Sequence, residues 1–344
     1  MTTQTQLSPP TVRSATVRGV GLFISTFLLI LAALLSVAVG SALLSPNTVL
    51  SALFTPDGSV SQITVTGVRV PRTLLGIAVG VALGIAGALM QALTRNPLAD
   101  PGLLGVNGGA ALSVAIGVTA FGLVRIADYV WWAFGGAAVA AILVYAIAAR
   151  SRGGITPVRL TLVGMALSAV FLGSATLLTL VDPRTFDRMR FWGVGSITDR
   201  PDGTLRTVLP FIVAGVILSM LCARALNALA LGDDVAKSVG VRVGVIRSFG
   251  FIAVVLLCGA STAAAGPIAF VGLMIPHAVR RITGPDQRWI LPYALLLAPT
   301  LVLLSDVAGR ILVWPAELQL GIMTALIGGP VLILLVRTSS RITW

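Results

Sequence analysis

Long intervals without a charged residue divide this chain, and they constrain its fold more than any other feature of the sequence. Of its 344 residues only 10% are charged, whereas a soluble domain carries about 25%. A membrane-spanning helix needs about 20 apolar residues, and a charge at its centre is costly. A water-soluble protein is therefore excluded, and an all-α integral membrane protein is predicted. The intervals are 19–44, 73–94, 101–124, 129–149, 160–181, 207–223, 248–279, 289–305 and 318–336.

The interval 248–279 is too long for one upright helix. Basic residues flank both of its ends, and Gly266-Pro267 lies just past its middle. Proline removes a backbone donor and glycine allows a tight turn, so we expect a hairpin of two helices here. The prediction becomes ten transmembrane helices with both termini on one side.

The distribution of basic residues supports this topology. The segments assigned to the cytoplasm hold fifteen Lys and Arg against four Asp and Glu, whereas the opposite segments hold nine against eight. Because cytoplasmic loops are enriched in basic residues, both termini are predicted to be cytoplasmic. The net charge of +12 is therefore interpreted as a sign of membrane orientation and not of nucleic-acid binding. Five plus five helices would permit an inverted repeat.

One membrane domain is predicted to fill the chain. Residues 1–18 form a cytoplasmic tail, 19–337 the ten-helix transmembrane domain and 338–344 a second cytoplasmic tail. The first apolar run exceeds the core of a signal peptide, so it is read as an uncleaved span.

Three polar or glycine-rich segments are candidates for function. Glycines at every fourth position, from Gly76 through Gly80 to Gly84, predict a central helix that other helices approach closely. The proline-containing loop 94–110 is predicted to line a pathway at its cytoplasmic mouth. The acidic turn after Gly232 predicts a short cytoplasmic helix that contacts a partner.

Arginines mark the opposite side. Arg69 and Arg72 flank Pro71, and Arg310 follows Asp306 by four residues, a spacing that allows an ion pair on a helix. Exposed arginines could equally receive carboxylates of a partner.

Residues for bond chemistry are sparse. His277 is the single histidine, which argues against zinc-protease and Ser-His-Asp sites, and no metal site is predicted. Ala236 precedes the only lysine, Lys237, so the phosphate-loop pattern is missing. Cys222 and Cys258 lie in apolar stretches and are predicted to be packing residues. The chain is therefore predicted not to be an enzyme.

Ordered motifs extend from about Leu22 to Arg337. They are RVPRTL at 69–74, GALMQ at 87–91, NPLADPGLLG at 96–105, LG at 231–232 with VG at 239–240, GPIAFVGL at 266–273 with IPH at 275–277, and 306–310 with Glu317-Leu318. Together these motifs resemble the FecCD (BtuC-like) permeases of bacterial ABC importers for ferric siderophores, haem and cobalamin. The stretches 157–162, 190–192 and 224–227 look most like permease subunits for catecholate siderophores such as ferric enterobactin.

The resemblance implies roles for particular residues. Arg69, Arg72 and Arg310 would receive acidic residues of an extracytoplasmic binding protein. The segment 231–247 would couple to the ATPases. The implied coupling residues are Leu231, Gly232, Asp233, Val239 and Gly240, and the implied cytoplasmic gate residues are Asn96, Leu98, Thr156, Pro157 and Val158.

The resemblance also implies an assembly in the bacterial inner membrane. The partners would be a second permease, two ATPases and a siderophore-binding protein, and the chain would also contact membrane lipid. A second permease that is related in sequence is favoured over another copy of this chain. The chain would bind no cofactor, since ATP and magnesium would be used by the ATPases. The expected function is import of a ferric siderophore, and import of cobalamin or haem is the alternative. A secondary transporter or a membrane enzyme fits less well, because the spans hold few ionisable residues.

Overall fold

The computed structural model describes residues 15–40, 44–55, 58–123, 126–150 and 156–338. Within these residues the chain is helical and contains no strand. The long helices are α1 (Ala15–Ala38), α4 (Val70–Thr94), α5 (Val106–Phe121), α6 (Ile126–Arg150), α7 (Pro157–Val181), α9 (Thr204–Ala230), α11 (Val243–Ala265), α12 (Val271–Thr283), α13 (Gln287–Leu312) and α14 (Leu320–Thr338). The short ones are α2 (Pro46–Phe54), α3 (Val60–Thr64), the π-helix Val65–Arg69, the 3-10 turn Pro101–Leu104, α8 (Pro183–Trp192) and α10 (Asp233–Ser238).

Seven helical segments in this described part are long and apolar enough to cross a membrane. They include α1, α6, α7, α9, α11, α13 and the continuous helical run Val60–Thr94 that contains α4. The apolar helix α5 is shorter, and α12 has 13 residues. The prediction of an all-α membrane protein is thereby confirmed.

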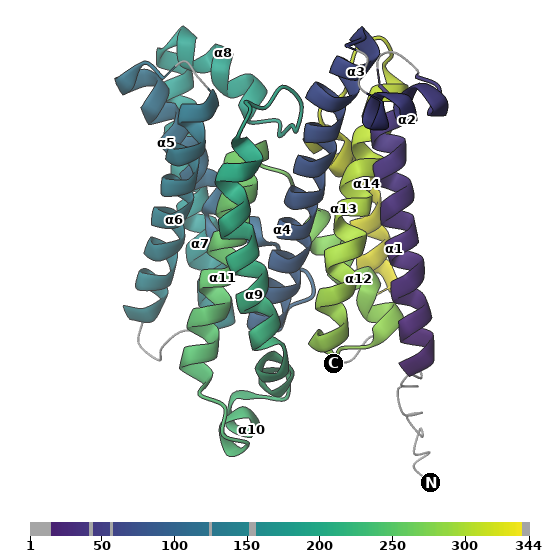
Figure 1. Ribbon diagram of the computed structural model, residues 1–344. Coiled ribbons are helices and arrows are strands. Elements are labelled where there is room, and N and C mark those ends of the chain that lie inside the picture. The colour runs from purple at the N-terminus through teal and green to yellow at the C-terminus, as the bar shows by residue number, and fades with distance from the viewer. Residues whose placement is uncertain (1–14, 41–43, 56–57, 124–125, 151–155, 339–344) are drawn as a thin grey trace.

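The helices stand side by side as a bundle with two distinct ends (Figure 1). At one end, named the α8 end, lie α2, α3 and α8; at the other, named the α10 end, lies α10. Helix α1 begins and α14 finishes at the α10 end. Of the predicted tails, residues 1–14 and 339–344 lie outside the described residues, whereas residues 15–18 belong to α1 and Thr338 to α14.

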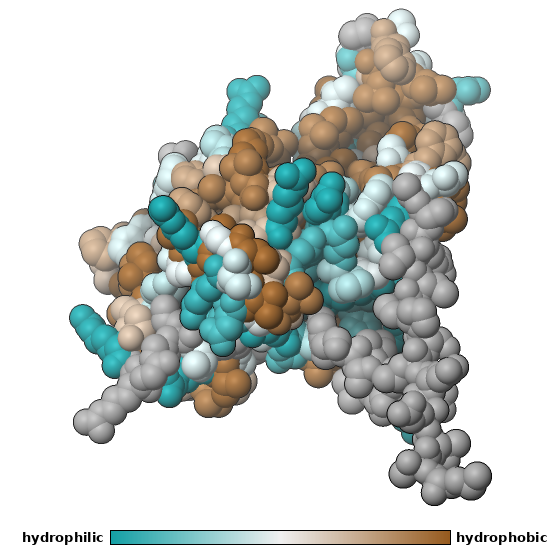
Figure 2. All heavy atoms as spheres, turned by 90° about the horizontal axis from the view of Figure 1, so that it is seen from below, coloured by the Kyte–Doolittle hydropathy of each residue, from teal (hydrophilic) through white to brown (hydrophobic). Residues whose placement is uncertain are grey.

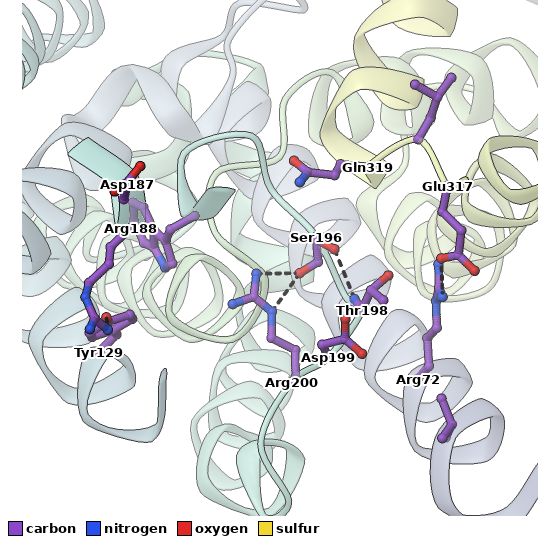
Figure 3. A pocket seen from close by; sticks show the side chains of 13 residues that line it. Arg72, Tyr129, Asp187, Arg188, Ser196, Thr198, Asp199, Arg200, Glu317 and Gln319 are labelled. Atoms are coloured by element: carbon purple, nitrogen blue, oxygen red, sulfur yellow. Dashed lines mark hydrogen bonds and ion pairs between the residues drawn. The ribbon is translucent and has the colours of Figure 1, made fainter. Parts of the chain in front are cut away.

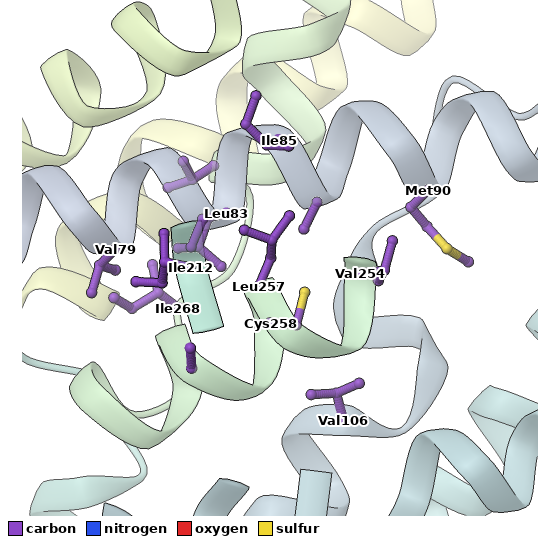
Figure 4. Close-up of a cluster of buried hydrophobic side chains, with 14 of the residues drawn as sticks. Val79, Leu83, Ile85, Met90, Val106, Ile212, Val254, Leu257, Cys258 and Ile268 are labelled. Carbon is purple, nitrogen blue, oxygen red and sulfur yellow. The ribbon is translucent and has the colours of Figure 1, made fainter. Parts of the chain in front are cut away.

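Helix α4 occupies the centre, packed against α9, α11, α12 and α13. Its glycine face explains this position, because a Cβ added to Gly80 would collide with the backbone of Pro299 on α13 and one added to Gly87 with the backbone of Gly272 on α12. Small residues allow such close approach of helices. The predicted central helix is confirmed, and its own Leu83 packs in the core drawn in Figure 4 together with Leu257 and Cys258 of α11.

The predicted break at Gly266-Pro267 is present. Helix α11 ends at Ala265, Gly266 has φ +76°, and α12 starts at Val271. A positive φ suits glycine, which lacks a Cβ. The apolar interval 248–279 is therefore two helices and not one.

Several helices extend beyond the charge-free intervals that predicted them. Helix α13 continues through Asp306 and Arg310, α4 includes Arg72, and the π-helix before it ends with Arg69. These residues can lie inside helices because Arg72 and Arg310 pair with Asp306, and Arg69 donates to backbone carbonyls. Interval boundaries therefore underestimate helix length where an ion pair forms between helices.

Candidate functional sites at the two ends of the bundle

A buried ion-pair cluster joins α4 to α13 at the α8 end. Arg72 donates through Nη2 to Oδ1 of Asp306 at 2.7 Å and through Nε to Oδ2 at 3.0 Å. Its Nη1 donates to Oε2 of Glu317, also at 2.7 Å. The fork of the guanidinium thus meets two carboxylates at once, a geometry that lysine cannot reproduce.

The other two predicted docking arginines lie beside this cluster. Arg310 pairs with Asp306 and donates to the carbonyls of Ser36 and Val39, while Arg69 donates to the carbonyls of Val37 and Ala38. The helical Asp306–Arg310 pair expected from their spacing is therefore confirmed.

Burial bears on the docking prediction for these arginines. The exposed fractions of Arg69, Arg72 and Arg310 are 4%, 8% and 2%. In this conformation the three guanidinium groups bind partners inside the protein. Arg69 and Arg310 bind carbonyls at the end of α1, and Arg72 holds α13 against α4.

A cavity of about 780 Å³ opens next to this cluster; we name it the α8-end cavity (Figure 3). A second hollow of about 590 Å³ adjoins it and shares Arg72 and Arg200 with it. The α8-end cavity is lined by Val68, Arg72, Tyr129, Asp187, Arg188, Trp192, Ser196, Thr198, Asp199, Arg200, Glu317, Leu318 and Gln319.

Arg200 is fixed at the wall of this cavity by backbone carbonyls. Its Nε and Nη2 donate to the carbonyl of Ser196 at 2.9 and 2.7 Å, and Nη2 also donates to the carbonyl of Ala265 at 3.1 Å. Burial lowers the pKa of Arg200 to about 10, partly opposed by the charge of Asp199. The guanidinium nevertheless stays positive at neutral pH.

At the α10 end, the loop after α4 folds back into the protein. Arg95 adopts a left-handed conformation with φ +51°, Ala99 and Pro101 are buried, and Pro101 lies against Gly272 of α12. Asp100 caps the 3-10 turn by accepting from the amide of Gly102 at 2.7 Å. Irregular backbone at membrane depth is tolerated only under a cover of protein or water, and here protein supplies it.

Two parts of the predicted cytoplasmic gate meet at this end. Asn96 of the loop and Val158 of α7 both line a cavity of about 320 Å³. Thr156 caps α7 by accepting from the amide of Arg159, and Leu98 is exposed but does not line the cavity. The side chain of Pro157 lies outside the described residues. The fold therefore brings Asn96 and Val158, which are about sixty positions apart in the sequence, to one opening.

The predicted coupling segment contains the short helix α10. Val235 of α10 and the flanking Leu231 and Val239 are exposed, and the view onto this end shows hydrophobic side chains among long hydrophilic ones (Figure 2). Gly232 and Gly240 border the helix with φ +118° and +83°. Exposed apolar side chains at such a helix are typical of a contact surface.

Asp233 connects α10 to the loop after α4. Its carboxylate accepts from Arg95 and, at 3.0 Å, from Arg247 of α11. Sequence analysis did not single out Arg95 for this contact, because no spacing rule relates a loop arginine to a carboxylate 138 positions away. Arg200 was likewise only one of several arginines in a mixed-charge segment.

No group of three or more His, Cys, Asp or Glu that could hold a metal occurs in the described part of the chain. His277 is buried on α12, and Cys222 and Cys258 are buried and unbonded to each other. The packing role predicted for the cysteines is confirmed.

Comparison with known proteins gives consistent results. The model of the FecCD transport family matches residues 28–338. The ferric enterobactin transport system permease FepD of Escherichia coli is 46% identical over 315 residues, which cover 91% of this chain and 94% of that protein. The Fe(3+)-citrate import permease YfmD of Bacillus subtilis is 40% identical over 88% of this chain and 90% of its own, and the hemin permease HmuU of Yersinia pestis is 38% identical over 76% and 80%.

The fold is also found among solved structures. An ABC transporter assigned to the metal-chelate type, captured in an inward-facing conformation, matches with a TM-score of 0.82 and 28% identity. The match covers 93% of this chain and 99% of that one.

Proposed function

Because the chain belongs to the FecCD transport family, we propose that it is the permease subunit of an ATP-driven importer that moves a ferric siderophore across the bacterial inner membrane. The observation that carries the proposal is the extent of the similarity to a ferric enterobactin permease, which covers nine tenths of both chains. The membrane location agrees with the seven apolar spans of the described residues. Hemin is the second candidate cargo, since a hemin permease is also a close relative.

The proposed topology has ten crossings with the α10 end in the cytoplasm. It is supported by the excess of basic residues in the segments at that end and by the placement of the first and last long helices there. On this view α5, α12 and α14 cross as shorter helices, and the surrounding bundle covers most of α5 and α12. The relation of the two halves as an inverted repeat stays a prediction.

The proposed gate lies at the cavity shared by Asn96 and Val158, with Leu98, Thr156 and Pro157 at its edges. It is supported by the covered, irregular loop that enters the bundle beside α12. Helix α7 lies on one side of this cavity and the loop after α4 on the other. The two could move apart without breaking hydrogen bonds within a helix.

The proposed ATPase contact is the 231–247 segment, with Leu231, Gly232, Asp233, Val239 and Gly240. It is supported by the exposed apolar side chains of α10 and by the ion pairs that tie Asp233 to Arg95 and Arg247. Movement of α10, driven by the ATPases, would thus be transmitted from Asp233 to Arg95, which precedes Asn96 in the chain.

Docking of a binding protein on Arg69, Arg72 and Arg310 stays a prediction, and it requires their present internal partners to be released. Glu317, the partly exposed member of the cluster, is where such release would begin. A related second permease is proposed to pack on this chain, and the exposed apolar side chains of α7 and α14, such as Leu177, Leu180 and Leu326, support an apolar neighbour.

The test is uptake into proteoliposomes. The permease, its co-purifying permease and the ATPases are reconstituted, and iron-55 is supplied as ferric siderophore with and without the binding protein. Uptake that needs ATP and the binding protein is expected. If cobalamin or hemin entered while iron stayed outside, the proposed cargo would be wrong; uptake without ATP would refute the importer mechanism.

A further inference from the structure

We propose that Gln91 of α4 is a positioning residue that fixes the loop carrying Asn96 to helix α12, so that this loop and α12 move as one body during transport. The inference rests on the proposed function, because it concerns the movement of the proposed gate. It gives the gate loop a partner helix that holds none of the proposed gate residues.

Helix α12 contains a proline that leaves one backbone carbonyl without its usual donor. In an α-helix the carbonyl of Gly272 would accept from the amide four positions later, but that residue is Pro276, which has no N–H. A carbonyl buried in a membrane bundle needs a partner, and a neighbouring helix can supply it. A Cβ added to Gly87 would lie 1.9 Å from this oxygen, so the carbonyl points at α4.

Gln91, one helical turn beyond Gly87 on α4, supplies the missing donor. Its Nε2 donates to the carbonyl of Gly272 at 3.3 Å and to that of Leu273 at 3.1 Å. Arg280, two turns further along α12, donates to Oε1 of Gln91. Because arginine carries only donors, it determines which end of the amide faces the carbonyls. Both polar atoms of this fully buried side chain are therefore used between α4 and α12.

The backbone of Gln91 holds the loop after α4. Its carbonyl accepts from the amide of Asn96 at 3.2 Å. Further along the loop, Pro101 packs on the same turn of α12, because a Cβ added to Gly272 would lie 3.1 Å from its ring carbon Cδ. Gln91 thus joins two structures, since its side chain binds the first turn of α12 and its main chain binds the loop.

These contacts indicate which parts of the proposed gate move together. The loop is held to α12 at two places, by Gln91 and by Pro101, and α12 in turn packs on α13. On its other side, the loop meets α7 at the cavity that Asn96 and Val158 line. Hydrogen bonds and a packed proline resist separation, whereas an open cavity does not. The loop and α12 are therefore expected to shift together relative to α7.

Distances between spin labels test this movement directly. The complete importer, with partner subunits that lack reactive cysteines, carries one label at Leu98→Cys on the loop. The second label is at Ile282→Cys on α12 or at Leu162→Cys on α7, and all three positions are exposed. Cys222 and Cys258 are buried, so they are not expected to react. Between the ATP-free and the ATP-trapped state, the distance from Leu98 to Leu162 should change and that from Leu98 to Ile282 should not.

Gln91→Met is the key variant, because methionine fills a similar volume and forms none of these hydrogen bonds. It should broaden the distribution of Leu98–Ile282 distances and lower the iron-55 transported per ATP hydrolysed about threefold or more. Met90→Leu is the matched control, since Met90 is the buried neighbour on α4 and donates no hydrogen bond to α12. Its distances and its iron transported per ATP should equal those of the wild type.

Pro276→Ala separates this role from general packing. Alanine restores an amide that can donate to the carbonyl of Gly272 within α12. The fall in unfolding temperature caused by Gln91→Met should therefore be smaller when Pro276→Ala is also present. An equal fall in both backgrounds would overturn the assignment of Gln91 to this carbonyl.

A wild-type Leu98–Ile282 distance that changes as much as the Leu98–Leu162 distance would overturn the inference and leave the importer function intact. Wild-type distances and wild-type iron per ATP in Gln91→Met would also overturn it. A Leu98–Leu162 distance that is the same in both states would refute the proposed gate, and the inference with it. Wild-type proteoliposomes without ATP-dependent iron uptake would refute the proposed function itself. Because the first comparison keeps Gln91, it holds even if Gln91→Met fails to fold.

Discussion

Arg72 on α4 and Asp306 on α13 form a two-point ion pair inside the bundle, although 234 positions separate them in the chain. The pair is 8% and 1% exposed. Loss of either residue would leave the other with one buried counter-charge, Glu317 for Arg72 and Arg310 for Asp306, so the contact between the helices would be weakened.

Replacement of Arg72 by alanine is expected to destabilise the protein by up to about 3 kcal/mol, the lower end of the cost of breaking a buried ion pair, because Asp306 keeps Arg310 as a partner. Arg72→Lys should recover part of the loss but not the second hydrogen bond. Thermal unfolding of the purified permease in detergent measures this. A double variant that also carries Asp306→Ala should lose much less than the sum of the single losses; strict additivity would show that the two residues act independently.

The ion pairs of Asp233 are expected to matter for coupling more than for stability. Both Arg95 and Asp233 are about one-third exposed, and exposed pairs contribute roughly 0.2–1 kcal/mol. Arg95→Ala should therefore fold normally and retain ATPase binding, while iron transported per ATP hydrolysed falls. Uptake and hydrolysis are measured on the same proteoliposomes. Arg184→Ala, which removes an exposed arginine of α8 at the opposite end that lines neither cavity there, is the control; an equal effect of both variants would contradict a specific link.

Gly240 next to α10 is expected to tolerate no bulky side chain. Its φ of +83° is disfavoured for residues with a Cβ by roughly 1 kcal/mol or more. Gly240→Val should weaken co-purification of the ATPases and lower uptake, and Gly240→Asn should do so less. Gly244→Ala is the matched control, since Gly244 is helical, exposed and has no atom near its Cβ position. Normal assembly of Gly240→Val would refute this contact.

Gly87 is expected to be essential for packing of α4. A side chain there would meet the backbone of Gly272, which cannot move as a flexible side chain could. Gly87→Leu should lower the unfolding temperature sharply or prevent accumulation in the membrane. Gly135→Ala on α6, where nothing lies within 4 Å of the added carbon, should be neutral. Similar yields and unfolding temperatures for both variants would show that α4 can shift.

Much of this architecture could be predicted because local rules govern it. The apolar intervals, the break at Gly266-Pro267 and the glycine face of α4 are all confirmed, and each depends on residues close together in sequence. The charge-free intervals leave out Arg72 and Arg310, whereas α4 and α13 contain them, because both arginines pair with Asp306.

Composition and periodicity determine which residues are helical, roughly how long each helix is and which class of protein the chain belongs to. They can do so because backbone hydrogen bonds within a helix join residues four apart. The partners of Arg72, Arg95 and Arg200 lie up to 245 positions away and depend on how whole helices pack. No short-range pattern encodes whether an arginine meets a carboxylate or a carbonyl. Packing alone made Arg72 a tie between two helices, Arg95 a link to α10 and Arg200 a cation held by backbone carbonyls at a cavity.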